Sequence, residues 1–188
     1  AADLAAVAPA TLSPDEALDR AELESWVASD LFSLVDMDAP RKSPGFYEPL
    51  FGVSAYIDHE YAPVEVRAER LATQEEAALA EVPHVRENLT APLSKPVAEV
   101  EARNFAGFVT YLRGDVVKVM GQAGDAAQRQ RFAKANEALA KAAADLSGGL
   151  KKEAARGDQS HVLGPGRYAK LRRVQEGLST PIDDFARM

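Results

Sequence analysis

Apolar residues recur at three- and four-residue spacing along most of this chain. The clearest runs are Phe105, Phe108, Val109, Leu112, Val116 and Val119, and then Phe132, Ala135, Leu139, Ala142, Ala143 and Leu146. An α-helix has about 3.6 residues per turn, so this spacing places each run on one helical face, whereas a strand would need alternation. We therefore predict an all-α fold, a multi-helix array with long antiparallel helix pairs and no significant sheet.

Proline and glycine divide the chain into about seven predicted helices. Their ranges are 14–36, 50–59, 61–82 with a continuation to 89, 97–120, 125–147 with an extension to 156, 165–176, and a short helix after Thr180. The range 50–59 mixes aromatic and β-branched residues, so a strand stays an alternative there. Residues 1–12 are interpreted as a tail and 13–188 as a single all-helical domain. A helix start signal at Thr180-Pro181 stands so near the last residue that we expect the natural polypeptide to continue.

The same periodicity predicts which side chains are buried. The helix at 14–36 is expected to bury Leu23, Trp26, Val27, Leu31, Leu34 and Val35. Among these, Trp26 is predicted to be a core anchor. Tyr61 is also treated as a core residue, whereas Arg67, Glu75 and Glu76 are assigned to a solvated outer face of the helix at 61–82.

Several expectations concern breaks and close contacts. The range 36–49 contains four helix-breaking residues and is predicted to be a loop. Pro83 is expected to interrupt or kink its helix, and Gly148-Gly149 offers another bend. The helices at 97–120 and 125–147 should form an antiparallel hairpin. Gly107 and Gly114 inside the first of them suggest that a neighbouring helix approaches closely.

Composition and charge exclude several classes of function. The chain has no cysteine, which rules out disulfides, thiolate catalysis, cysteine-bound zinc and iron–sulfur clusters. Its formal net charge of −7, with scattered cations, argues against nucleic acid as a partner. No apolar run reaches the roughly 18 residues that a membrane span needs. Because the chain begins Ala1-Ala2-Asp3-Leu4, we expect either a removed leader or a piece of a longer protein.

The histidines do not form the zinc motif of helical proteases. That motif needs two histidines four residues apart with a glutamate beside the first, so that both imidazoles share one helical face. His59-Glu60 begins such a pattern, but Pro63 stands where the second histidine is required. His84 and His161 are remote in the sequence. We interpret all three histidines as surface or ordinary hydrogen-bonding residues, and we assign no metal ligand.

Other candidate chemistry is weaker. The carboxylate pairs, Asp58 with Glu60, Glu75 with Glu76, and Asp183 with Asp184, are interpreted as solvated. Gly164-Pro165-Gly166 lacks the spacing of a nucleotide-binding loop and is interpreted as a helix start. Basic residues gather late in the chain, at Lys151, Lys152, Arg156, Arg167, Lys170, Arg172 and Arg173. They either bind an acidic partner or solubilise a helix. No catalytic or cofactor-binding residue is assigned within 1–188.

An ordered set of short motifs points to one protein family. The set comprises the helix from Leu23 to Leu34, Phe46-Tyr47 before Gly52, Tyr61-Ala62-Pro63 with Arg67, Arg86-Glu87-Asn88-Leu89, Gly107, and Leu163-Gly164 with Tyr168, Leu171-Arg172 and Gly177. In order and rough spacing it resembles the first part of a bacterial family catalogued as domain of unknown function 885. Complete members of that family look like zinc metallopeptidases of the helical gluzincin type.

The resemblance implies a helical N-terminal region that packs against a catalytic part further along the polypeptide. The zinc and a peptide substrate are implied for the full-length protein, not for this chain, which carries no zinc motif. A soluble bacterial protein, either cytoplasmic or exported after leader removal, is the implied setting.

Three hypotheses about function follow. In the first, the chain is the non-catalytic helical part of a zinc-dependent peptidase-like hydrolase and forms a wall of its substrate cleft. This hypothesis predicts an exposed apolar face. In the second, the chain is a self-sufficient helical interaction or scaffold domain without catalysis, and no large apolar patch is expected. The third, an independent hydrolase built from carboxylates and the three histidines, has the least support.

Overall fold

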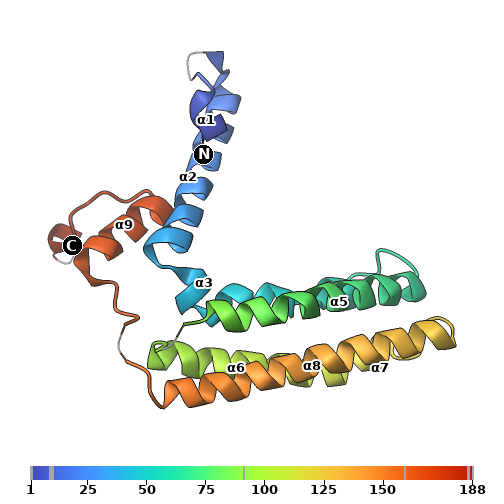
Figure 1. The fold of residues 1–188 in the computed structure, drawn as a ribbon. Helices are drawn as coiled ribbons and strands as arrows, with labels where there is room; N and C mark the ends of the chain where they lie inside the picture. The colour runs from blue at the N-terminus through green and yellow to red at the C-terminus, as the bar shows by residue number, and fades with distance from the viewer. Residues whose placement is uncertain (1, 9–10, 91, 159, 186, 188) are drawn as a thin grey trace. The chain divides into compact units, whose positions relative to one another are not determined.

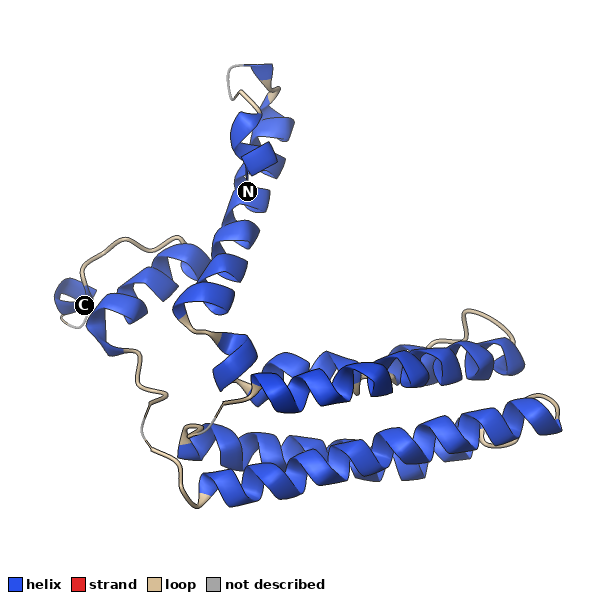
Figure 2. Cartoon of the chain, viewed as in Figure 1, coloured by secondary structure: helices blue, strands red, loops and turns tan. Residues whose placement is uncertain are grey.

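The computed structural model is mostly helical over the residues that it describes. These residues are 2–8, 11–90, 92–158, 160–185 and 187. Figure 2 shows helices joined by loops, and the described ranges contain no strand, so the predicted all-α fold is confirmed. No described helix combines the length and the apolar character that crossing a membrane requires.

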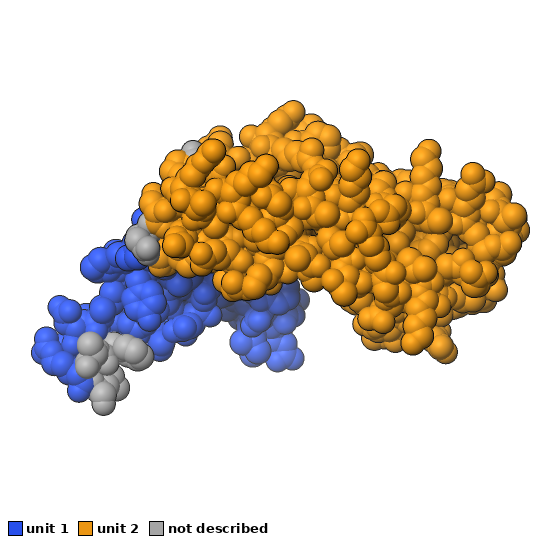
Figure 3. Space-filling model, turned by 90° about the horizontal axis from the view of Figure 1, so that it is seen from below, with its two compact units in different colours: residues 1–39, 162–188 blue, residues 40–161 orange. Residues whose placement is uncertain are grey.

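Two compact units make up the chain (Figure 3). Unit 1 consists of Ala1–Ala39 and Val162–Met188, and unit 2 of Pro40–His161. Unit 1 is therefore assembled from both ends of the chain, whereas unit 2 is one continuous segment.

Three long helices form the body of unit 2 (Figure 1). They are α5 (Val64–Asn88), α6 (Lys95–Tyr111) and α8 (Ala126–Ala154). A π-helical turn, η4 (Leu112–Val116), and the short α7 (Val117–Met120) continue the direction of α6 toward the turn before α8. Asp125 and Gln128 form a reciprocal capping box at the start of α8, which satisfies N–H groups that the first turn leaves free.

Hydrogen bonds from α8 fix its direction relative to α6. Asn136 donates to the backbone carbonyl of Leu112 at 3.0 Å, and Ser147 donates to that of Ala102 at 2.7 Å. As the residue number rises along α8, the number of the partner residue on η4 or α6 falls, so the two segments run in opposite directions. The predicted antiparallel hairpin is confirmed.

The polar pairs between α5 and α8 show the opposite relation. Arg131 donates to the hydroxyl of Thr73 at 3.0 Å, and fourteen residues later Asp145 accepts from Arg86 at 3.4 Å. Both partners advance together, so α5 and α8 run in the same direction, and α6 runs against both.

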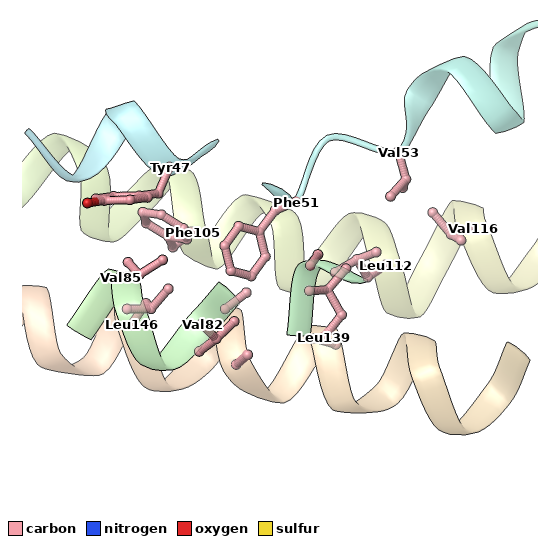
Figure 4. Close-up of a cluster of buried hydrophobic side chains, with 14 of the residues drawn as sticks. Tyr47, Phe51, Val53, Val82, Val85, Phe105, Leu112, Val116, Leu139 and Leu146 are labelled. Atoms are coloured by element: carbon pink, nitrogen blue, oxygen red, sulfur yellow. The ribbon is translucent and has the colours of Figure 1, made fainter. Parts of the chain in front are cut away.

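The core of unit 2 lies between these helices and the segment that precedes α5 (Figure 4). Phe51 stands edge-on against Phe105 with ring centroids 5.2 Å apart, and Leu112 and Leu139 face one another further along the hairpin. The face predicted for 125–147 is buried at every position named for it. Since half of that face is alanine, the helices can approach closely.

The range 36–49 is not a loop, contrary to the prediction. It contains α3 (Ala39–Lys42) and the 3-10 helix η3 (Pro44–Leu50). Pro44 stands in the first turn of η3, where a missing N–H is harmless, and the hydroxyl of buried Tyr47 donates to the carbonyl of Pro40 at 2.8 Å. The range 50–59 contains the helix α4 (Ser54–Asp58), so the helical alternative is the correct one.

Proline and glycine interrupt these helices less than expected. The helix α5 continues through Pro83, an exposed residue, so the predicted interruption is absent there. The helix α8 continues through Gly148-Gly149, because Leu150 and Ala154 beyond them pack into the core. A Cβ added at Gly107 would meet nothing within 4 Å, so close helix packing does not account for that glycine.

Unit 1 is built around α2 (Pro14–Leu31) and α9 (Gly164–Glu176). Ser13 and Glu16 form the expected capping box on α2, and Gly177 ends α9 with a left-handed backbone at φ 68°. A π-helical turn, η2 (Phe32–Asp36), extends α2. The short α1 (Ala2–Ala6) and α10 (Ile182–Phe185) stand near the two ends of the chain, and Ala1, Pro9, Ala10 and Met188 lie outside the described residues.

The predicted burial of α2 was wrong. No described residue of α2 is buried, and Trp26, the expected core anchor, is 62% exposed. Phe32 of η2 is the buried aromatic residue of this region instead. It lies under Lys170 of α9, whose ammonium is 6.0 Å from the ring centroid and 2.7 Å from a carboxylate oxygen of Asp36.

Candidate functional site

The three histidines lie on separate elements. His59 follows α4, and His84 is in the last turns of α5, where its Nδ1 is 3.5 Å from a carboxylate oxygen of Glu87. His161 lies 3.0 Å from the hydroxyl of Ser94 at the start of α6. Among the described residues, no three His, Asp or Glu side chains are grouped as metal ligands would be. These residues do not fit a zinc site, so we derive no zinc-dependent step from them.

The residues assigned to the outer face of α5 divide into two kinds. Arg67 and Glu75 are buried, contrary to the prediction, whereas Glu76 is exposed and paired with Arg131 of α8 at 2.6 Å. The guanidinium of Arg67 donates to the carbonyls of Tyr56 at 2.6 Å and Ala62 at 3.1 Å. Arg67 therefore fastens the turn between α4 and α5, which is a structural role.

Glu75 is the most unusual of these side chains. It is 0% exposed, and neither carboxylate oxygen has a hydrogen-bond partner within the described part of the chain. Burial, and secondarily the charge of Glu76, raises the pKa of Glu75 to about 8. At neutral pH the group is therefore mainly an uncharged carboxylic acid inside the helical core.

Its spacing could have revealed this burial. Arg67 and Glu75 stand four residues before and after Leu71, and Ala78 and Val82 continue the same stripe. The pattern of positions thus predicted the inward face correctly, whereas the residue types suggested solvent.

A second acid, Glu101 of α6, also has a raised pKa. Glu48 of η3 and Glu101 of α6 are both half-buried, and the side-chain amide of Asn104 donates to Glu48 at 2.8 Å and to Glu101 at 3.4 Å. Burial first, then the hydrogen bond and charge of Glu48, raises the pKa of Glu101 to about 7. The two acids are 53 positions apart in the sequence, so no local spacing indicated the pair.

A shallow hollow of about 540 Å³ adjoins this pair on α6. It is lined by Glu48, Arg103, Asn104, Gly107, Phe108 and Tyr111. The absent side chain of Gly107 leaves the surface open there, which gives that glycine a consequence different from the predicted helix contact.

The remaining sequence candidates have ordinary structural roles. Gly164, which has a φ of +71°, is the first residue of α9, so a helix begins where it was predicted. Asp183 and Asp184 are exposed on α10. Among the late basic residues, Lys170 pairs with Asp36, and the buried Arg172 donates to the carbonyl of Thr180 at 3.4 Å.

Unit 1 has exposed large apolar side chains on α2 and η2. We define the α2 apolar surface by Leu23, Trp26, Leu31, Leu34 and Val35. Each of these side chains is at least 44% exposed. Large apolar side chains clustered on one helix are characteristic of surfaces that bind another protein, whereas scattered ones need no explanation.

Comparisons with protein-family models, with curated proteins and with solved structures found no match to this chain.

Proposed function

We propose that this chain is the non-catalytic helical part of a zinc-dependent peptidase-like hydrolase. Its role would be to form a wall of the substrate cleft, with the catalytic part, on the same or a separate polypeptide, covering the α2 apolar surface. The single observation that supports this role is the exposure of that surface, with Trp26 at 62%. The family, the zinc and the peptide substrate rest on the sequence resemblance.

Burial of the α2 apolar surface would provide the energy for association. Each large apolar side chain that moves from water into a packed interface contributes roughly 1.5–3 kcal/mol before the entropic cost of association. Five such side chains on one helix and its π-helical extension therefore suit a stable partner better than a transient one.

A self-sufficient scaffold domain is the second candidate. Unit 2 supports it, because its three long helices enclose a core of their own. The α2 apolar surface counts against it, since a monomeric scaffold would be expected to cover or replace those side chains.

Native mass spectrometry with zinc analysis, on protein isolated from its source cells, distinguishes the two candidates. The proposal expects a larger, zinc-bearing species, either an assembly that releases this chain on denaturation or one longer polypeptide. A zinc-free species with the mass of this chain alone would contradict the proposal and favour the scaffold.

A matched pair of variants links the assembly to the α2 apolar surface. Trp26→Lys places a charge in that surface and should abolish or strongly reduce the larger species where the catalytic part is a separate chain. Val100→Lys alters an exposed apolar residue of α6 and should leave it intact. Where both parts form one polypeptide, limited proteolysis replaces the mass measurement, and Trp26→Lys should accelerate cleavage between them.

A further inference from the structure

The contact between η3 and α6 contains two acids and one amide. The Nδ2 of Asn104 donates to Oε1 of Glu48 at 2.8 Å and reaches Oε2 of Glu101 at 3.4 Å. Two ionised carboxylates that share one hydrogen-bond donor repel each other, whereas a carboxylic acid and a carboxylate form a hydrogen bond. The arrangement is therefore stable with one proton and strained with none.

The backbone of η3 encloses the Glu101 carboxyl group. A Cβ added at Gly45 would lie 2.7 Å from Oε1 of Glu101, so the carboxyl group rests against the position where any other residue would carry a side chain. This contact removes water from one side of Glu101. Burial accordingly contributes most to its pKa of about 7, ahead of Glu48, while Asn104 acts in the opposite direction.

Neither acid of the pair forms an ion pair with a described residue of α5, α6 or α8. Glu48 is the charged group of η3 that acts on Glu101. Arg103 of α6 lines the neighbouring hollow, and Lys151 of α8 lines a separate one with Glu99. The net charge of the pair is therefore set by whether the two acids hold a proton.

We propose that Glu48 and Glu101 share one proton and act as a pH-sensitive latch that fastens Pro44–Leu50 to α6. When the proton leaves, the two negative charges repel, and η3 loosens from the helix. The aromatic contact of Phe51 with Phe105 keeps the following residues in the core, so the release is local. This latch lies within unit 2 and is independent of the function proposed above.

The protonation of the latch is tested by carbon-13 NMR of the glutamate carboxyl groups in the full chain. In the native protein, Glu101 should titrate near neutral pH. In Glu48→Gln, the titration of Glu101 should move toward the ordinary range of a glutamate. Gly45→Ala should move it the same way, because the added methyl group displaces the carboxyl group. An ordinary titration of Glu101 in the native protein, unchanged in Glu48→Gln, would overturn the proposal.

The release of η3 is tested by amide hydrogen exchange. The N–H of Phe51 donates to the carbonyl of Glu48, and that of Phe46 to Ser43, so both report on η3. The native protein is compared at each pH with Glu101→Gln, which mimics the protonated acid, and with Glu99→Gln, an exposed acid on the same helix.

Between pH 6 and pH 8, the exchange of these amides relative to Glu101→Gln should rise several-fold. The limit is about tenfold, because the pKa of Glu101 is about 7 while η3 is docked and 4.5, the ordinary value, once it is released. Glu99→Gln should follow the native protein. Equal exchange in the native protein and Glu101→Gln at both pH values would show that the acids do not control η3, and would overturn the latch.

Discussion

The stability of Glu75→Gln relative to the native protein should increase as the pH rises. The native side chain is fully buried and has no hydrogen-bond partner for either oxygen among the described residues. Its pKa is about 8 in the folded protein, against an ordinary value of 4.5 when the chain unfolds. Between these values the unfolded chain releases the proton and the folded protein retains it, so the unfolded state is favoured increasingly. Glutamine has nearly the same shape and cannot ionise.

The magnitude follows from the difference between the two pKa values. The free energy of unfolding of the native protein should fall by about 1.4 kcal/mol per pH unit from about pH 4.5 to about pH 8, and no further above that. Glu75 lowers the free energy of unfolding by roughly 3 kcal/mol at pH 7, and by about 5 kcal/mol once it is ionised in both the folded and the unfolded state. The native protein thus loses stability as the pH rises. A carboxylate paired with a cation has the opposite effect, because its contribution to stability is lost as the pH falls.

Urea unfolding at pH 5, 6, 7 and 8, followed by far-ultraviolet circular dichroism, measures this difference. Fluorescence of Trp26, the single tryptophan, follows unit 1 separately, because Glu75 is in unit 2. The advantage of Glu75→Gln over the native protein should grow by about 2 to 3 kcal/mol from pH 5 to pH 7. The slope with pH is the decisive quantity, since the amide of glutamine also needs hydrogen-bond partners and shifts the baseline.

Glu76→Gln is the matched control. Its carboxylate is exposed, and hydrogen bonds from Arg131 hold the pKa of Glu76 below its usual value. That interaction is fully present above the ordinary glutamate pKa and is lost only on acidification below it, so the difference between this variant and the native protein should stay nearly constant from pH 5 to pH 8. A constant difference between native protein and Glu75→Gln across the four pH values would refute the reasoning.

Three further substitutions have calculable outcomes. Gly107→Ala should stabilise the protein by about 0.5–1 kcal/mol, because the added methyl group meets no neighbour, and thermal unfolding should show a raised midpoint. Phe51→Ala should cost about 3–5 kcal/mol in urea unfolding, since Phe51 is fully buried against Phe105, and a loss under about 1 kcal/mol would contradict that packing. Tyr61→Ala should cost less than about 1 kcal/mol, because the ring is 48% exposed beneath Arg70, which corrects its sequence-based placement in the core.

Periodicity predicted unit 2 well because its helices are covered by each other. Phe105, Leu112 and Val116 are buried as expected, and so is the predicted face of α8. In such a bundle, the stripe that avoids water is the stripe that meets the neighbouring helix. Val119, at the end of the first stripe, is 39% exposed, because the hairpin turns soon after it.

The acids could not be placed by the same reasoning. Residue type suggested that Glu75 was solvated, although its position on the stripe with Leu71 and Val82 indicated burial. The pairing of Glu48 with Glu101 depends on how a 3-10 helix docks on a helix that follows 45 residues later. Local spacing contains no information about that contact, so the pair becomes apparent only in three dimensions.

The exposed surface of α2 defines the limit of periodicity more generally. An apolar stripe shows that a helix face avoids water, but it does not say which molecule covers that face. In α8 the stripe is covered by α5 and α6 of the same chain, whereas Trp26 of α2 and Leu34 of η2 are exposed. Since α2 is well capped at Ser13 and joined to α9 through Ser25 and Val174, the stripe is not a product of a poorly formed helix. We propose that the partner described above, and not a defect of folding, accounts for apolar residues in water on a helix formed this well.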